Sequence, residues 1–447
     1  MVNLDGLIAT LVFMAGIAAV IVLTSRFKVQ PFLVIFFTAL AVGLASGLPP
    51  EGMGDLVVEG FSRVLGFTAV ITVAALIIGV VMQQTGAVFV ISRAILGLLG
   101  KGRSQFAIGV IGYIVAYPVQ CCDTSFIMLS PLLQSLMSGG AVNTMVYVLT
   151  LSAGAFVSYS MLFPAAPLLP VTILGADIGS FLILGFASSI PALIVGLLIA
   201  DRLGRRFELK VDSGGSKTLE EMGAQYGRLP SMASVSSIII VPTALIISRS
   251  ALRSIFNGNA LPILDFVGNP VIALPLGMLL AIGLLARGRK IEEVNRMVSE
   301  GVTKSASVLM IVGSGSVLAT VLQRTGVGFF LGNLALGLHL PGLLVVFVIA
   351  ALLKTAQGGT TVTMTTTTAI IAPLLPSLGV SAVMAAVAIC AGAMILMHVN
   401  DSFFWVVTGF TRMEVATGYK TLTIIMAVMG IVTFASISLI GPILGFA

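Results

Sequence analysis

The chain of 447 residues is 58% hydrophobic and only 9% charged, and its mean hydropathy is +1.14. Soluble domains carry roughly 25% charged residues, so this composition excludes a water-soluble protein and indicates one whose partner is a lipid bilayer. The formal net charge of +6 does not indicate nucleic-acid binding, because the basic residues lie at the ends of apolar runs and in one central loop.

Apolar runs close to the ~20 residues that cross a bilayer follow one another along the chain. We expect membrane helices at about 4–24, 29–48, 64–82, 104–118, 142–163, 178–200, 232–250, 266–286, 305–322, 341–353, 379–398 and 420–446. The first run is longer than the apolar region of a signal peptide and has no basic residues before it, so we interpret it as a span. The sequence therefore predicts an all-α polytopic membrane protein.

The segment 201–230 is the only stretch with a soluble-like composition, and it holds six Lys and Arg residues. The positive-inside rule makes it cytoplasmic, and its Gly and Ser content suits a flexible linker. We therefore predict a first membrane repeat at 1–200, a cytoplasmic linker loop at 201–230 and a second membrane repeat at 231–447.

Two polar segments interrupt the apolar sequence, one in each half. The run YPVQCCDTSFIMLSP (117–131) contains Asp123, and the run KTAQGGTTVTMTTTTAIIAP (354–373) contains a lysine, a Gln-Gly-Gly turn and eight threonines. Polar, Gly-broken backbone at membrane depth is tolerated only where protein buries it or where it lines a wet cavity. We predict re-entrant helical hairpins at about 117–137 and 355–378, a pattern typical of the binding site of a secondary transporter.

An internal repeat links the two halves. Glu59-Gly60 begins a segment that ends at Gln83-Gln84-Thr85-Gly86, and Glu300-Gly301 begins one that ends at Gln323-Arg324-Thr325-Gly326. Acidic residues flank the first copy and basic residues flank the second, which indicates opposite orientations in the membrane. We predict two inverted-topology repeats with both termini in the periplasm and with hairpins that meet near the midplane, the geometry of alternating access.

Asp123 is the first candidate for a functional side chain. An ionisable group inside a membrane segment costs ~2.5–3.5 kcal/mol on insertion scales and indicates a functional site by default. We expect Asp123 to take up a proton on one side of the membrane and to release it on the other. The alternative is a helix cap, in which its carboxylate accepts the amides of Ser125 and Phe126.

The tip of the second hairpin offers backbone amides, an amide side chain and hydroxyl groups, which together suit a carboxylate with vicinal hydroxyls. Lys354 suits an anionic substrate or a carboxylate partner, and the alternative is a lysine that snorkels to the membrane surface. The residues expected to bind substrate are Asp123, Thr124, Ser125, Tyr159, Lys354, Gln357, Gly358, Gly359, Thr360, Thr361, Thr363, Thr365, His398 and Asn400.

His398, Asn400 and Asp401 follow an apolar span and precede the aromatic run Phe403-Phe404-Trp405. We expect His398 and Asp401 to take part with Asp123 in proton coupling. The alternative places this polar group near a membrane surface, with the tryptophan in the interfacial aromatic belt.

Four runs resemble the gluconate permease family, the gluconate:proton symporters of the ion-transporter superfamily. They are KTAQGGTTVTMTTTTAIIAPLL (354–375), HVNDSFFWVVTGF (398–410), CDTSFIMLSPL (122–132) and LGADIGSFLILGF (174–186), and the resemblance extends over nearly the whole chain. It implies a bacterial inner-membrane carrier for gluconate, other sugar acids, small hydroxy acids or D-serine, and related folds imply a homodimer.

The chain departs from the family pattern at two places near the expected site. Cys121-Cys122-Asp123-Thr124-Ser125-Phe126 stands where the family has an aromatic-Asp-Val-Gly-Phe run, and Ser158-Tyr159 stands where the family has Thr-His. The substrate is therefore left open among the small organic anions.

These features predict a secondary active transporter that carries a small organic anion into the cell together with protons. The alternatives are a carrier of a small amino acid such as D-serine, a sodium-coupled carboxylate symporter, a channel, or an intramembrane enzyme that uses Cys121 or Cys122. A phosphate-binding loop, an H-E-x-x-H motif and a Cys/His cluster are all missing from the sequence, so we expect no enzyme activity, no metal site and no cofactor.

Overall fold

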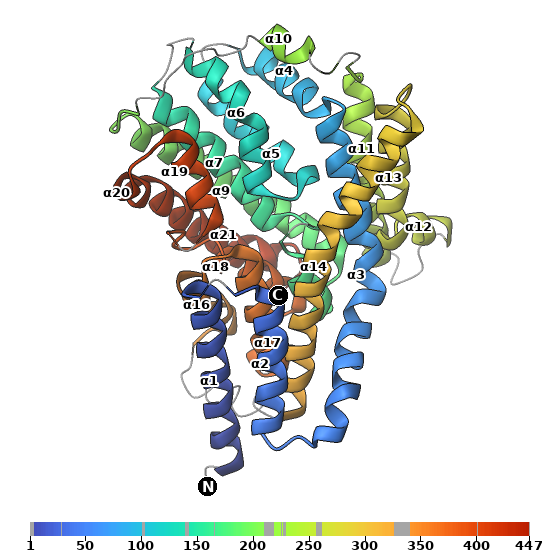
Figure 1. Ribbon diagram of the computed structural model, residues 1–447, viewed down its shortest axis with the longest axis vertical. Coiled ribbons are helices and arrows are strands. Elements are labelled where there is room, and N and C mark those ends of the chain that lie inside the picture. The colour runs from blue at the N-terminus through green and yellow to red at the C-terminus, as the bar shows by residue number, and fades with distance from the viewer. Residues whose placement is uncertain are drawn as a thin grey trace.

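The computed structural model describes residues 4–446 apart from positions 28, 101–102, 139–142, 165, 210–218, 225, 227–228, 256–261, 326–339 and 400. Within these residues the fold is all-helical, as predicted (Figure 1). The helices are α1 (Leu4–Ser25), α2 (Pro31–Ala45), η1 (Pro50–Gly52), α3 (Met53–Gln84), α4 (Ala87–Leu99), α5 (Ser104–Val119), α6 (Cys122–Ser138), α7 (Thr144–Met161), α8 (Leu168–Ile173), α9 (Ile178–Gly204), α10 (Leu219–Ala224), α11 (Met232–Ile255), α12 (Pro262–Val267), α13 (Pro270–Leu285), α14 (Ile291–Thr325), α16 (Gly342–Gln357), α17 (Thr360–Leu378), α18 (Ala382–Gly392), α19 (Ser402–Thr411), α20 (Val415–Gly418), η3 (Tyr419–Thr423) and α21 (Ile424–Ile443).

The twelve predicted membrane spans fall on helical segments, but several of these helices are shorter than a full span. In the described residues, six helices are long and apolar enough to cross a membrane, or seven if α3 and α4 form one bent span. That bend of 70° lies at Gly86, whose φ of +76° is open to glycine without a steric penalty. The sequence did not predict α4, and the span predicted at 379–398 is wrong as a single helix, because α18 ends at Gly392 and turns follow.

The long helices α3 and α14 lie side by side and antiparallel along one side of the molecule (Figure 1). Glycine lets their backbones touch: a Cβ on Gly60 would lie 2.7 Å from the Cα of Val317, and a Cβ on Gly301 would lie 2.8 Å from the Cα of Ile77. Small residues at such positions are typical of close helix packing in membranes.

The ends of the α3–α14 pair carry matching polar contacts. Arg324 donates to Glu59 over 3.2 Å at one end, and Gln84 donates to Glu300 over 2.6 Å at the other. Adding about 240 to a residue number in the first half gives the corresponding residue in the second half. Under this correspondence each of the two polar contacts becomes the other one, and so does each of the two glycine contacts. Two inverted copies would make such reciprocal contacts across a two-fold axis.

Each half also contains two helices joined by a tight break inside the predicted hairpin segment. Between α5 and α6 the break is at Gln120 and Cys121, and Gln120 has a φ of +57°. Between α16 and α17 it is at Gly358, with a φ of +82°, and Gly359. Figure 1 shows α5 and α6 toward the end of the molecule that carries α10, and α16 and α17 toward the end that carries the N-terminus.

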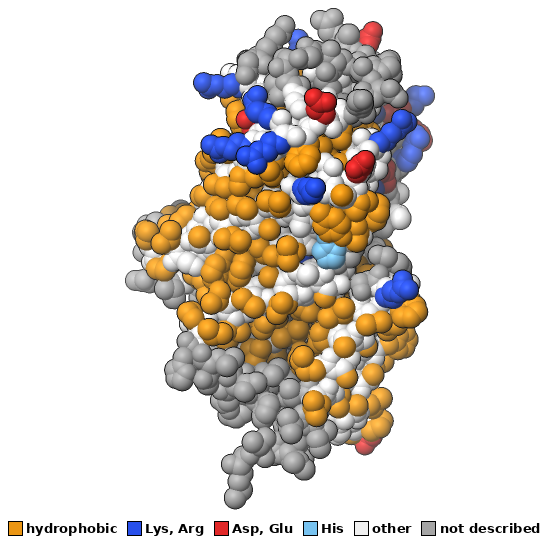
Figure 2. Space-filling view, turned by 90° about the vertical axis from the view of Figure 1, so that its left-hand side faces the viewer, with side chains coloured by type: hydrophobic (Ala, Val, Ile, Leu, Met, Phe, Trp, Pro, Cys, Tyr) orange, Lys and Arg blue, Asp and Glu red, His pale blue; other side chains and the backbone are white. Residues whose placement is uncertain are grey.

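Charge is distributed unevenly along the long axis. Figure 2 shows that Lys and Arg side chains gather at the end that carries α4 and α10. The described parts of the predicted linker 201–230 lie at this end, and they include the exposed Arg205 at the end of α9. Hydrophobic side chains cover most of the face below it in the same view, as expected for a surface in contact with lipid.

Candidate functional site

Lys354, in the last turn of α16, is completely buried. Its ammonium group donates to the carbonyl oxygen of Gly358, to Oγ1 of Thr360 over 2.9 Å and to Oδ2 of Asp401. A lysine has three N–H donors, so all of them are used within the protein. The side chain therefore pairs with a carboxylate, one of the two functions predicted for it, and does not snorkel to the surface.

Asp401 joins this ion pair to the start of another helix. It is the N-cap of α19, where its Oδ1 accepts the amide of Phe403 over 2.8 Å. Its other oxygen binds Lys354, so both carboxylate oxygens have partners. The ion pair thus links the end of α16, the start of α17 and the start of α19, and the carboxylate stabilises the α19 N-terminus both as a cap and as a negative charge.

Asp123 is half-buried in the first turn of α6, close to Asp401 but with different partners. Ser402 donates its hydroxyl to Oδ2 over 2.9 Å, and the Cys122 thiol lies 3.5 Å from Oδ1. The Ser125 amide donates to the carbonyl of Cys121 instead. The described contacts of Asp123 therefore differ from the cap predicted as its alternative role, and its hydrogen-bond donors are neutral.

The tip of the second hairpin is tied to the first half of the chain. Tyr159, in the last turn of α7, lies with its hydroxyl 2.6 Å from Oγ1 of Thr361 at the start of α17. The tip of the first hairpin is tied to the second half in the same way, through Asp123 and Ser402. Each hairpin tip is thus hydrogen-bonded to a residue of the opposite half. The second tip bonds to the end of α7, and the first tip bonds to the start of α19.

Several polar groups around α17 have no hydrogen-bond partner among the residues that the structure describes. The N-cap of α17 is Gly359, which has no side chain to bind the first amides of the helix. Gln357 Oε1, Thr363 Oγ1 and Thr365 Oγ1 are buried without a hydrogen bond. Leaving such a group unpaired costs about 1–3 kcal/mol, so these atoms mark positions that a polar ligand or water would stabilise.

Other threonines of α17 direct their hydroxyls to groups of α17 itself or of the last residue of α16. Thr367 and Thr368 donate to the carbonyls of Thr363 and Met364 over 2.7 and 2.6 Å. The Thr366 hydroxyl lies 3.4 Å from Nε2 of Gln357. The threonines predicted to bind substrate are therefore different residues from Thr367 and Thr368, whose hydroxyls donate to carbonyls of the same helix.

His398 fastens the segment after α18 to α16. Its Nε2 lies 2.8 Å from the carbonyl oxygen of Thr355, and its ring stacks on Tyr419 with 6.4 Å between the centroids. Asn400 lies outside the described residues. Trp405 is half-exposed and donates to the carbonyl of Val399 over 2.7 Å, so it packs beside the polar segment rather than away from it.

Some contacting residues were not predicted from the sequence. Ser402 directly follows the predicted Asp401, and Phe156 places its ring centroid 5.5 Å from the Lys354 ammonium. A cation above an aromatic ring gains further electrostatic stabilisation. In the sequence, Ser402 could have been identified only by its position beside Asp401. Phe156 lies in an apolar run, and nothing in the sequence marks it as part of the site.

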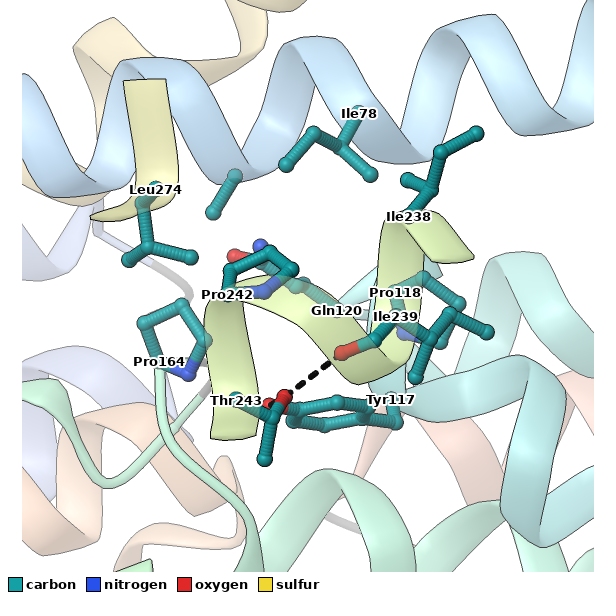
Figure 3. A pocket seen from close by; sticks show the side chains of 11 residues that line it. Ile78, Tyr117, Pro118, Gln120, Pro164, Ile238, Ile239, Pro242, Thr243 and Leu274 are labelled. Carbon is teal, nitrogen blue, oxygen red and sulfur yellow. Dashed lines mark hydrogen bonds between the residues drawn. The ribbon is translucent and has the colours of Figure 1, made fainter. Parts of the chain in front are cut away.

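A separate small cavity of about 30 Å³ lies behind the first hairpin. Figure 3 shows Tyr117 and Thr243 together at one edge of it, where their hydroxyl oxygens lie 2.9 Å apart, with Gln120 behind Pro242. The side chains that line it come from α3, α5, α11, α13 and the segment after α7, and the predicted substrate-binding residues are not among them.

Comparison with known proteins gives a family match over most of the chain. Residues 8–443 match the model of the GntP family permeases. The chain is 28% identical to the inner membrane permease YgbN of Escherichia coli, with 94% of this chain and 96% of that protein covered. It is 30% identical to the low-affinity gluconate transporter of Escherichia coli, with 92% and 93% covered.

Among solved structures, the chain is similar to the YdaH transporter of Alcanivorax borkumensis, which is described as having an unusual topology. The TM-score is 0.65, and 98% of each chain is covered. The sequence identity is 15%, so this likeness concerns the fold alone.

Proposed function

The chain belongs to the GntP family of permeases, and from this premise we propose that it carries a small organic anion into the cell together with protons. It is a multi-helix membrane transporter and not an enzyme. The proposed substrate class is the sugar acids and small hydroxy acids, and the proposed mechanism is alternating access.

The convergence of the two hairpin tips supports this proposal most strongly. Asp123 reaches Ser402, and Thr361 reaches Tyr159. In secondary transporters, broken helices from two repeats meet at the substrate site, because their free ends supply unpaired backbone groups and dipoles. The reciprocal contacts between α3 and α14 support the proposed inverted repeats in the same way.

The proposed position of the substrate is the start of α17. The uncapped amides that follow Gly359 suit a carboxylate, because a helix N-terminus carries partial positive charge. The unpaired oxygens of Gln357, Thr363 and Thr365 suit the hydroxyl groups of a sugar acid or hydroxy acid. Lys354 keeps all three donors engaged in this conformation, so we assign it to holding the site together rather than to the substrate.

The proposed proton carrier is Asp123. The charged and titratable groups near it are Asp401, Lys354, Cys122 and Tyr159. Asp401 already has the Lys354 ammonium as its counter-ion, whereas the hydrogen-bond donors to Asp123 in the described residues are neutral. A carboxylate with neutral partners inside the membrane is stabilised by taking up a proton.

Charge distribution and family membership support the proposed location. We assign the end rich in Lys and Arg, with α4 and α10, to the cytoplasm of a bacterial inner membrane. The N-terminus, which lies at the opposite end in Figure 1, would then be periplasmic, and we propose the same side for the C-terminus. We also propose a homodimer, on the analogy of related folds.

Uptake into proteoliposomes tests the proposed function. Radiolabelled gluconate, glycerate, lactate, 3-hydroxybutyrate and D-serine are offered under an inward pH gradient, with and without sodium. Glucose is the matched control, because it has the hydroxyls of gluconate but no carboxylate. We expect accumulation of at least one acid that requires the pH gradient and is indifferent to sodium.

Other results would overturn the proposal. Accumulation that requires sodium would indicate a sodium-coupled carboxylate symporter, and accumulation of D-serine alone would indicate an amino-acid carrier. Equilibration without accumulation under the same gradient would indicate a channel.

A further inference from the structure

We propose that the Lys354 ammonium is a tethered cation that fills an oxygen cage, and that this cage binds a free Na⁺ ion once the ammonium is removed. The cage consists of the Gly358 carbonyl, the Thr360 hydroxyl and the Asp401 carboxylate. The inference concerns an ion site in the fold, and its test uses neither a substrate nor a gradient.

The three oxygens of the cage are chemically suited to a cation. A carbonyl, a hydroxyl and a carboxylate are the ligands that hard cations take in proteins. They come from three different elements: Gly358 from the break after α16, Thr360 from the start of α17 and Asp401 from the N-cap of α19. A simple ion pair would need only the carboxylate, so the convergence of all three on one point forms a cation site.

Both charged residues at the cage are buried. Lys354 is completely buried, and Asp401 is 3% exposed. Removing the ammonium leaves one negative charge and three acceptor oxygens without a donor, which is strongly unfavourable in a low-dielectric interior. A proton on Asp401 would neutralise the charge but would supply only one donor. A small cation would neutralise the charge and bind all three oxygens.

The surroundings of the ammonium also favour positive charge. The Phe156 ring lies with its centroid 5.5 Å from Nζ, and the face of an aromatic ring favours any cation held above it. The Gly358 carbonyl follows the last turn of α16, where the helix dipole is negative. Both features act on positive charge itself, so they would favour Na⁺ as well as the lysine.

A tethered cation has a functional consequence, and this step rests on the proposed function. A charge fixed to α16 cannot be released to either side of the membrane, so this cage cannot deliver a coupling ion. The coupling ion must bind elsewhere, and Asp123 with its neutral partners is available for a proton. Lys354 would thus be the residue that makes the second hairpin independent of sodium.

Thermal unfolding of the purified full chain tests the inference. Wild type and Lys354→Ala are compared in NaCl, LiCl, KCl and choline chloride at equal ionic strength. We expect the Tm of the wild type to be the same in all four salts. We expect Lys354→Ala to have a lower Tm in choline and to regain part of it in Na⁺, with a saturable dependence on concentration.

Further variants keep the test decisive. Lys354→Met retains the apolar stem and ends one atom short of the ammonium, so it leaves the cage open if the alanine variant does not fold. Lys354→Ala/Asp401→Asn removes the carboxylate of the cage, and its Tm should not respond to Na⁺. Lys304→Ala is the matched control, because it removes an exposed lysine that pairs with Glu300.

Two results would overturn the inference. The first is identical unfolding of Lys354→Ala and Lys354→Met in Na⁺ and in choline. The second is failure of both variants to fold in every salt, Na⁺ included. Because no substrate or pH gradient is used, either result would leave the proposed function standing, and a failed uptake assay would leave the cation cage standing.

Discussion

Lys354 and Asp401 lie 47 residues apart in the sequence and form a buried ion pair at the point where α16, α17 and α19 meet. This pair accounts for two features of the site. It uses every donor of the lysine, and it neutralises one of the two neighbouring carboxylates, whereas the hydrogen-bond donors to Asp123 among the described residues are neutral. The site therefore has one carboxylate for structure and one for the proposed proton.

Asp401→Asn should strongly destabilise the protein, since it keeps an acceptor for the Phe403 amide but leaves the buried ammonium without its counter-ion. Breaking one partner of a buried pair costs about 3–5 kcal/mol. The matched control is Arg205→Ala, which removes an exposed pair with Asp201 and should cost at most about 1 kcal/mol. Thermal unfolding in detergent measures both, and equal effects would contradict the prediction.

Tyr159→Phe removes only the hydroxyl that meets Thr361. Loss of one hydrogen bond, worth about 0.5–1.5 kcal/mol, should raise the KM for uptake by roughly 2–13-fold. Thr361→Val should have a similar effect, and the double variant should be no worse than either single one. Tyr147→Phe is the control, because Tyr147 bonds Ser104 away from the hairpin tips. Additive effects of the two variants would show that the pair does not act as a unit.

Gly60→Ala and Gly301→Ala should each lower the stability by about 1–3 kcal/mol, because the new Cβ would overlap the backbone of the facing helix. The two losses should be similar if the contacts are related by a two-fold axis. Gly54→Ala, also on α3, meets nothing within 4 Å and should be neutral or slightly stabilising. Unequal losses at Gly60 and Gly301 would count against the proposed inverted repeat.

Asp265, in the short helix α12, should make stability depend on pH. Hydrogen bonds from Arg253 and Arg249 lower the pKa of its carboxyl below the ordinary value. Its contribution is therefore complete above the unfolded-state pKa of about 3.9 and is lost as the pH falls through the lower folded-state pKa. The difference in Tm between wild type and Asp265→Asn should be constant near neutral pH and shrink below about pH 4. A difference that persists unchanged to pH 3 would contradict this.

Composition predicted the membrane fold and both hairpin segments, since Gln-Gly-Gly and Cys-Cys-Asp sequences are rare in apolar surroundings. The exact residues at which the helices end could be located only from the backbone of the structure. The predicted span 104–118 ended close to the end of α5 at Val119, but the left-handed conformation of Gln120, which its side chain does not favour, could be found only from the structure.

The end of α18 at Gly392 could not be predicted, because the sequence through 382–397 is continuously apolar. The packing there depends on a distant helix: a Cβ on Gly392 would lie 2.5 Å from the carbonyl oxygen of Phe347 on α16. Likewise Asp123 was predicted as a functional residue, but its partner Ser402 lies 279 residues away in the sequence. Only the tertiary structure brings these two side chains together.

The role of Asp123 is tested most directly by measuring protons and substrate in the same vesicles. Proteoliposomes with a trapped pH-sensitive dye receive the substrate without a pre-imposed pH gradient, for wild type and for Asp123→Asn. We predict that substrate entry acidifies the lumen with the wild type, and that Asp123→Asn exchanges substrate without moving protons. Acidification by Asp123→Asn at the wild-type ratio of protons to substrate would show that another group carries the proton.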